Sequence, residues 1–229
     1  MNLHERLMAA YLAAREGRHE EALDEYIWFH ENALKMDPAF RGVRLSFALT
    51  YWLELGSQYP KAMDALTTIR DHKTQLLSEG VQDRDLFQDV VALNESLGRT
   101  SETHLLFKNL AMLHPEFATA CARLAIPAIL KAGDFELARR FLVDPQATID
   151  RLSASFNEDI EFARDEQSED TSKAMFDAFV TNHSEHIAQV LTVLSETGDS
   201  RMAAVLREKA IQSVCDTSAR DAFAALLDA

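Results

Sequence analysis

The sequence has few of the residues that interrupt regular structure. Only 7 glycines and 5 prolines occur among its 229 residues, which argues against a disordered or low-complexity chain. Hydrophobic residues make up 47% of the chain, enough for a sizeable buried core. No segment shows the alternation of β-branched and polar residues that is typical of a strand. The composition therefore predicts an all-α protein.

Basic residues are also scarce. The chain has 23 Lys and Arg against 37 Asp and Glu, for a formal net charge of −14. Such a charge repels nucleic-acid phosphates and anionic lipid surfaces, so we expect neither nucleic acid nor a membrane as a partner. A basic protein partner is electrostatically permitted, although the same charge also serves solubility.

Long apolar runs and clustered cysteines are missing as well. No stretch has the uncharged length needed to cross a bilayer, and the first residues lack the pattern of a secretory signal. Cys121 and Cys215 lie far apart in helical patterns, so we expect two small buried thiols in a reducing compartment. These absences predict a cytoplasmic protein.

Five of the glycines recur at one kind of position. Each is followed by a small or short residue five positions later, or six in one case; the pairs are Gly17 and Ala22, Gly56 and Ala62, Gly98 and Thr103, Gly133 and Ala138, Gly198 and Ala203. A lone glycine supplies the backbone of a tight turn, and a small residue lets two helices approach closely. The spacing predicts stacked helical hairpins.

Apolar periodicity places four hairpins in the first part of the chain. Their helices are expected at Leu3–Arg15 and His19–Met36, Val43–Leu55 and Ala62–Leu77, Arg84–Leu97 and Glu102–Leu113, and Phe117–Lys131 and Phe135–Leu142. Ser101 is the predicted N-cap of one of these helices. Pro127 is predicted to kink or split another.

The pattern weakens after residue 145. Helical periodicity continues from Gln146 to Thr181 across a polar break at Gln167–Ser172, which predicts a degenerate hairpin. A last hairpin is expected to pair Ser184–Glu196 with Arg201–Val214, followed by a capping helix at Ser218–Leu227. We therefore divide one continuous array into helical repeats at 1–145 and a divergent part at 146–229.

The segment from Arg84 to Pro115 resembles a tetratricopeptide repeat. Phe87 and Phe107 take the places of the family's two aromatic residues, Gly98 is the turn, Thr103 replaces the small alanine, and Pro115 ends the unit. The resemblance is divergent but covers most of the chain. It implies a right-handed superhelix of about five to six hairpins that binds a protein or peptide in its groove.

The same resemblance implies which residues face that groove. By spacing these are Leu7, Tyr11, Arg15, Ser46, Thr50, Glu54, Gln88, Ala92, Glu95 and Arg123. The family members that bind chaperone tails use lysine and asparagine at such positions to hold a terminal carboxylate. This chain does not match them, so the sequence does not support that ligand class.

Motifs for catalysis or cofactor binding are weak throughout. No glycine-flanked serine and no glycine-rich phosphate loop occurs, so we expect neither an enzyme nor a cofactor. His183 and His186 have the spacing of two ligands on one helix face, which leaves a metal-dependent enzyme as an alternative. The simpler interpretation is that both histidines cap or flank a helix that begins near Ser184, with no metal site.

Two surface features could serve recognition. The first is an acidic run from Glu158 to Asp170, which includes Asp159, Glu161, Asp165 and Glu166. It is either a solvated helix face followed by a loop or a docking surface for a basic protein. The second is Trp28, which lies one step off the apolar stripe of its helix and is predicted to be an exposed aromatic.

The leading functional hypothesis is a non-catalytic scaffold for protein–protein interaction. An alternative is a bacterial immunity protein or antitoxin whose negative charge masks a basic toxin, because acidic complementarity speeds association. Neither hypothesis identifies the partner.

Overall fold

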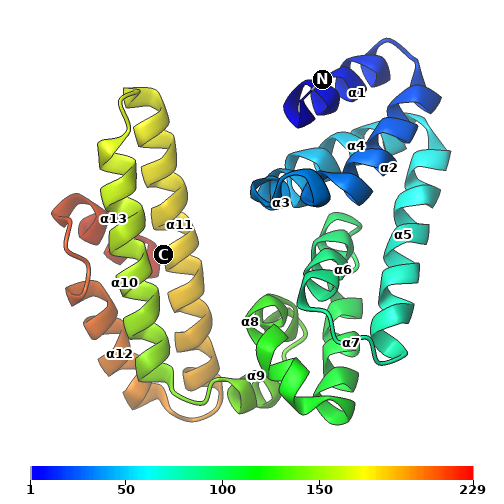
Figure 1. Ribbon diagram of the computed structural model, residues 1–229. Coiled ribbons are helices and arrows are strands. Elements are labelled where there is room, and N and C mark those ends of the chain that lie inside the picture. Colours follow the sequence, from blue (N-terminus) through cyan, green and yellow to red (C-terminus); the bar gives the residue numbers. More distant parts are fainter. Residues whose placement is uncertain (1, 229) are drawn as a thin grey trace. The chain divides into compact units, whose positions relative to one another are not determined.

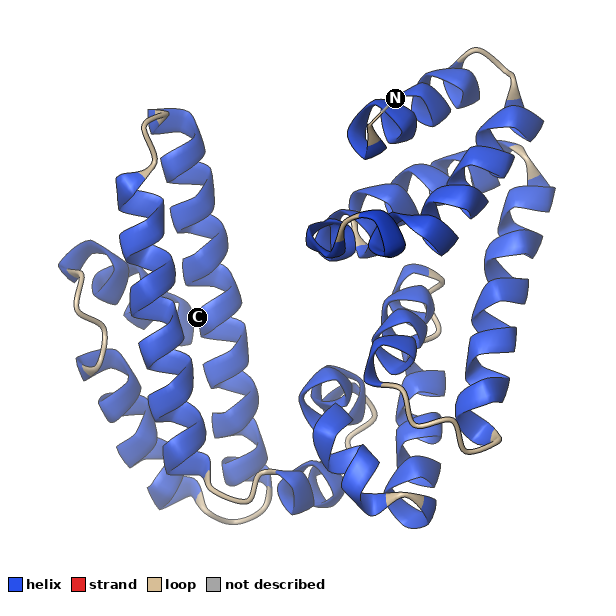
Figure 2. Cartoon of the chain, viewed as in Figure 1, coloured by secondary structure: helices blue, strands red, loops and turns tan. Residues whose placement is uncertain are grey.

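The computed structural model describes residues 2–228, and all regular structure in that range is helical (Figures 1 and 2). The chain forms two compact units, Met1–Ala128 and Ile129–Ala229. The boundary lies inside one helix, ahead of the division after residue 145 that the sequence predicts. Among the described residues, no helix is both long enough and apolar enough to span a membrane.

The first unit is a series of antiparallel helical hairpins. Its elements are α1 (Leu3–Arg15), α2 (His19–Met36), the short 3-10 helix η1 (Pro38–Phe40), α3 (Arg41–Leu45), α4 (Phe47–Gln58), α5 (Pro60–Ser78), α6 (Arg84–Ser96), α7 (Thr100–Leu113) and the larger part of α8 (Pro115–Lys131). α1 packs on α2, α4 on α5 and α6 on α7. These are the hairpins that the sequence predicts.

The second unit is built on two long helices. It contains the end of α8, then α9 (Phe135–Phe141), α10 (Pro145–Asp165), α11 (Glu169–Glu196), α12 (Ser200–Gln212) and α13 (Thr217–Leu227). α11 lies antiparallel to α10 and also contacts α12 and α13 (Figure 1). The predicted degenerate hairpin and capping helix are therefore both present.

Five glycines end helices in the same backbone motif. Gly17, Gly80, Gly98, Gly133 and Gly198 all have positive φ. In the turn at Gly98, the Gly98 N–H donates to the Glu95 carbonyl and the Arg99 N–H donates to the Asn94 carbonyl. The other four turns repeat this pair of hydrogen bonds, which satisfies carbonyl groups at the helix end. Small residues after four of these turns are buried as expected: Ala22, Thr103, Ala138 and Ala203.

The turn assigned to Gly56 is wrong. Gly56 lies inside α4, and the chain turns instead at Tyr59, which is extended, just before Pro60 at the start of α5. A proline disfavours helical backbone in the residue before it, so the helix runs on to Gln58. Gly80, which the sequence analysis did not assign, takes the vacant place among the five turn glycines.

Four smaller expectations also fail. Ser101 lies within α7, whose N-cap is Arg99, and α8 runs through Pro127 without being split. Cys215 is exposed, whereas Cys121 is buried. α11 runs unbroken across the predicted helix start near Ser184, because its polar residues at 181, 182 and 185 face solvent while Val180 and His183 remain buried.

Each unit has its own aromatic core. In the first unit, Tyr26 stacks on Trp52 with 6.1 Å between ring centroids, and the Trp52 indole donates a 2.9 Å hydrogen bond to the carbonyl of Ala62. In the second, His183 lies between Phe156 and Phe223, at 4.2 and 4.7 Å between centroids. Aromatic side chains thus fix how the hairpins of each unit pack.

Candidate functional site

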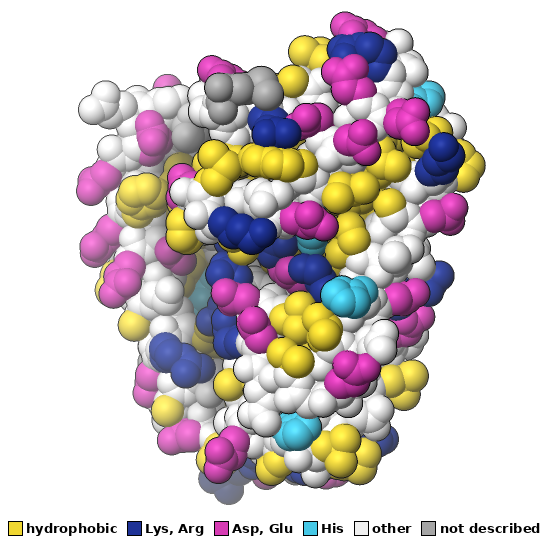
Figure 3. Space-filling view, turned by 45° about the vertical axis from the view of Figure 1, so that its right-hand side comes forward, with side chains coloured by type: hydrophobic (Ala, Val, Ile, Leu, Met, Phe, Trp, Pro, Cys, Tyr) yellow, Lys and Arg dark blue, Asp and Glu magenta, His cyan; other side chains and the backbone are white. Residues whose placement is uncertain are grey.

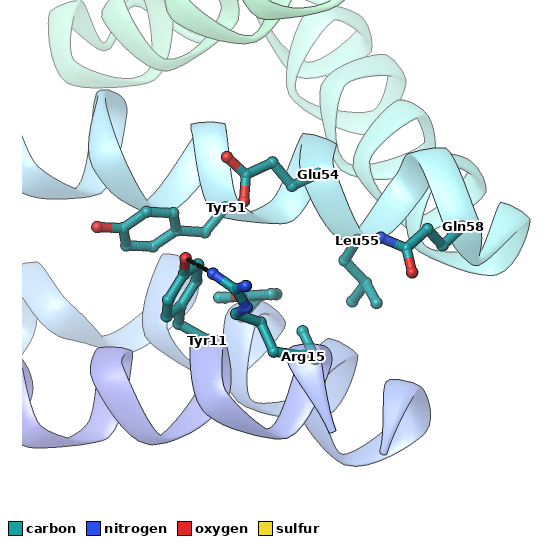
Figure 4. Close-up of a pocket in the computed structure, with 8 residues that line it drawn as sticks. Tyr11, Arg15, Tyr51, Glu54, Leu55 and Gln58 are labelled. Carbon is teal, nitrogen blue, oxygen red and sulfur yellow. Dashed lines mark hydrogen bonds between the residues drawn. The ribbon is translucent and has the colours of Figure 1, made fainter. Parts of the chain in front are cut away.

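A small pocket opens between α1, α2 and α4 in the first unit (Figure 4). Its volume is about 40 Å³, and it is lined by Tyr11, Ala14, Arg15, Tyr26, Tyr51, Glu54, Leu55 and Gln58. Three of these residues, Tyr11, Arg15 and Glu54, are positions that the tetratricopeptide resemblance assigns to a groove. The fold therefore gathers predicted residues from two hairpins into one site.

Two tyrosines form one wall of the pocket. The rings of Tyr11 on α1 and Tyr51 on α4 lie 4.6 Å apart at an angle of 39°. The Arg15 guanidinium lies one helical turn from Tyr11 and donates a 2.9 Å hydrogen bond to its hydroxyl. This hydrogen bond and the nearby phenol raise the pKa of Arg15, and the Glu54 charge acts in the same direction. Arg15 is therefore a permanent cation at the pocket.

Glu54 brings the opposite charge from α4. Figure 4 shows its carboxylate on the α4 side of the pocket and the Arg15 guanidinium on the α1 side. The ion pairs among the described residues do not join these two groups. The pocket therefore holds one cation and one anion that face the same space while each remains available to a ligand.

The Tyr26 hydroxyl is an unsatisfied polar group at this pocket. Tyr26 is 1% exposed, and its hydroxyl has no hydrogen-bond partner among the described residues. Burial raises the pKa of Tyr26, and the Glu54 charge raises it further, so the hydroxyl keeps its proton. A buried hydroxyl without a partner is uncommon in native proteins, because it has given up its hydrogen bonds to water.

The remaining predicted groove positions lie outside this pocket. Leu7 is part of the hydrophobic core. Ser46 and Thr50 are exposed, and their hydroxyls donate to the carbonyls of Gly42 and Ser46 within the helical backbone. Gln88 and Ala92 on α6 are half-buried, whereas Glu95 on α6 and Arg123 on α8 are exposed.

Sequence reasoning missed Tyr26, Tyr51 and Gln58. Tyr51 and Gln58 flank Glu54 at helical spacings of three and four residues, which could have placed them on its face. Tyr26 follows the buried stripe of α2 and gives no sequence signal of an unpaired hydroxyl.

Trp28 differs from its prediction. Its side chain is half-buried, and the Arg6 guanidinium lies 3.3 Å from the ring centroid. Arg6 in turn forms an ion pair with Glu25. A cation already covers the face of this indole, so Trp28 is not the open aromatic anchor that the sequence indicates.

The acidic run lies at one end of the α10–α11 hairpin. Glu158, Asp159, Glu161 and Asp165 belong to α10, and Glu166 belongs to the loop that follows. All but Asp159 are exposed. Burial, together with the Glu158 charge, raises the pKa of the half-buried Asp159. Most of the run is therefore a solvated helix face that continues into a loop.

A second pocket borders this acidic run. It has a volume of about 350 Å³ and is lined by Asn157, Ile160, Glu161, Arg164, Asp165, Cys215 and Asp216. Arg164 pairs with Asp216 at 3.2 Å, which ties α10 to the start of α13. Phe162, next to Glu161, is 65% exposed. The surface thus combines unpaired acids with an open aromatic ring.

His183 and His186 do not flank a helix end, as predicted, but lie in the middle of α11. His183 is packed between two phenylalanine rings, and its Nε2 has no hydrogen-bond partner. Burial, with the His186 charge adding to it, lowers the pKa of His183 to about 4. Within residues 2–228, no three His, Cys, Asp or Glu side chains are grouped as metal ligands.

Comparison with known proteins gives one structural likeness. The chain is similar to the crystal structure of a tetratricopeptide repeat protein from Parabacteroides merdae ATCC 43184, with 14% sequence identity and a TM-score of 0.29, over 95% of this chain and 82% of that one. No family model matches the sequence. No curated protein matches it either.

Proposed function

We propose that this protein is a non-catalytic scaffold that binds a peptide segment of a partner protein on the first unit. The observation that carries the proposal is the pocket between α1, α2 and α4. Tyr11, Arg15 and Glu54 come from two hairpins and meet there around a buried hydroxyl without a partner. Aromatic rings beside charged groups are the composition of many protein-binding hot spots.

The tetratricopeptide fold of the similar structure fits this function, because stacked hairpins present one helix of each pair along a continuous binding surface. The scaffold does its work by display: rigid hairpins hold side chains in place, and no bond of the partner is broken. In such a protein, binding depends on surface residues and tolerates core-preserving changes elsewhere.

Peptide selection from a random library tests this proposal. Peptides selected on the full chain should lose at least tenfold in affinity for the variant Glu54→Arg, which places two cations at the pocket. Glu116→Arg is a matched control, because Glu116 is an exposed acid on α8. Peptides that bind both variants as well as the native chain, or a library that yields no binder, would overturn the proposal.

A second candidate function is capture of a basic protein by the acidic run on α10. Its support is Phe162, which is 65% exposed among Glu158, Glu161 and Asp165. Exposed aromatics flanked by like charges suit a partner of opposite charge. A toxin neutralised by an immunity protein would be such a partner.

The two candidates use different surfaces, so one measurement separates them. On the face shown in Figure 3, acidic side chains are scattered between hydrophobic and uncharged ones and do not form one patch. Phe162→Ser should abolish capture of a basic partner and leave peptide binding at the Tyr11 pocket unchanged. Equal effects on both activities would contradict the separation.

A further inference from the structure

The unpartnered hydroxyl of Tyr26 points to a ligand for the pocket. Its side chain is 1% exposed and lines the pocket, while its hydroxyl lacks a partner among residues 2–228. The pocket is the space through which a polar atom can reach this hydroxyl. The inference below rests on the proposed function and gives the chemistry of what binds.

The size of the pocket limits the group that can enter. A volume of about 40 Å³ compares with roughly 10–15 Å³ for the centre of one water-sized sphere. The pocket therefore accepts about three heavy atoms. A carboxamide or a carboxylate has that size, whereas an aromatic ring or a guanidinium is too large.

The two charges select among the small groups. A carboxylate would be attracted by Arg15 but repelled by Glu54, and an ammonium would meet the reverse situation. A carboxamide has an oxygen that accepts and an NH₂ that donates. Its oxygen can accept from Arg15 or from the Tyr26 hydroxyl while its NH₂ donates to Glu54, and no charge is left unbalanced.

We propose that the pocket binds the side-chain carboxamide of a glutamine or asparagine in a partner peptide. Only the head group fits the measured volume, so the rest of the residue and the peptide lie outside the pocket. The rings of Tyr11 and Tyr51, 4.6 Å apart, supply apolar surface for the methylene groups that lead into it. The carboxamide thus acts as a plug between the two helices.

NMR of the full chain with ¹³C-labelled tyrosine tests this assignment. The protein has 4 tyrosines, of which Tyr11, Tyr26 and Tyr51 line the pocket while Tyr59 lies outside it. The probe is N-acetylglutamine N-methylamide, and its glutamate and lysine analogues are the comparisons. The glutamine probe should shift the three pocket tyrosines in a saturable way and leave Tyr59 in place. Equal shifts by all three probes, or none by glutamine, would overturn the proposal.

Charge variants make the selectivity predictable. In Glu54→Gln the repulsion of a carboxylate is gone, so the glutamate probe should bind at least as well as glutamine. In Arg15→Gln the lysine probe should gain in the same way. Unchanged preference in both variants would contradict the assigned roles of Arg15 and Glu54.

Tyr26→Phe separates binding from folding. Because the hydroxyl has no partner in the chain, its removal should leave the melting temperature equal or higher. The glutamine probe should nevertheless bind about five- to tenfold more weakly, as expected for the loss of one buried hydrogen bond. Full affinity in this variant would overturn the proposal. Selected peptides that require Glu54 but contain no glutamine or asparagine would overturn it too, yet leave the scaffold function intact.

Discussion

At the scale of single residues, His183 shows how packing sets a charge. Its ring lies parallel to Phe156 at 4.2 Å between centroids and is 4% exposed. Burial, with the His186 charge, lowers its pKa to about 4, against about 6.5 in an unfolded chain. Between these two pH values the unfolded chain binds a proton that the folded chain does not, so stability falls as pH decreases.

We therefore predict that His183→Phe removes part of the acid sensitivity of folding. The native chain should lose up to about 3 kcal/mol between pH 6.5 and 4 through this group, and the variant should lose that much less. Urea unfolding across this pH range measures the difference. His72→Gln is the control, because His72 is exposed on α5 and its loss should leave the native slope. A native slope in His183→Phe would show that the ring does not stay neutral.

Asp89 is the residue on which a buried polar cluster of the first unit depends. It forms ion pairs with Arg44 on α3 and Lys73 on α5, and Arg44 also donates to the carbonyl of His30 at 3.2 Å. Burial raises the pKa of Asp89, but the hydrogen bonds and charges of Arg44 and Lys73 lower it further, and the net direction is down. The carboxylate is therefore ionised at neutral pH.

Replacing Asp89 with Asn should cost about 3–5 kcal/mol, because the Arg44 charge stays buried without its counter-ion. Asp85→Asn on the same helix breaks an exposed ion pair with Arg41 and should cost less than about 1 kcal/mol. Chemical denaturation of both variants gives the comparison. Similar losses would mean that the buried pair adds no more than a surface pair.

Contacts of this kind could not be predicted from the sequence. Arg44 and Asp89 are 45 positions apart, and local periodicity contains no information about which distant side chains meet. The same holds for Tyr26, whose place on an apolar stripe predicts burial but not an unpaired hydroxyl. Tyr11, Arg15 and Glu54 were predicted because the repeat spacing puts equivalent positions of successive hairpins on one surface.

At the scale of elements, the turn glycines follow from backbone geometry. Gly98 has φ +68°, and no atom lies within 4 Å of the position that a Cβ would take. Gly42 is equally open but lies in the short helix α3 and has no positive φ. The pair separates backbone strain from crowding.

Gly98→Val should therefore cost about 1–2 kcal/mol through the left-handed backbone alone. Gly42→Val should cost less and could even stabilise α3, because valine has the higher helix propensity. Thermal unfolding of the two variants measures the contrast. Equal decreases in melting temperature would show that positive φ at Gly98 carries no penalty.

The elements that sequence reasoning placed wrongly share one cause. Gly56 and the polar residues around Ser184 look like helix ends by residue type, yet both lie inside helices. Pro60 decides the first case by forcing Tyr59 out of the helical region. Burial decides the second, since packing of Val180, His183 and Ile187 keeps α11 continuous. Tertiary contacts and a single proline outweigh local composition in both places.

At the scale of the whole molecule, the net charge of −14 has two separable effects. A global excess of negative charge speeds the approach of any basic partner, whereas a local cluster also fixes where that partner lands. The acidic run on α10 is the local case. Glu158, Asp165, Glu166 and Glu169 form no ion pair among the described residues, while Arg139 pairs elsewhere, with Asp199 at 3.4 Å.

Changing these four acids to glutamine should leave the free energy of unfolding unchanged or slightly raised, because exposed like charges repel and no internal pair is lost. If the second candidate function is right, association with a basic partner should slow and its salt dependence should flatten. Stopped-flow binding at several ionic strengths measures both. A control variant neutralises four exposed acids of the first unit, Glu20, Glu31, Asp64 and Glu116, and so carries the same net charge. Equal slowing in both variants would reduce the effect to global charge, because only a docking surface on α10 makes the position of the neutralised acids matter.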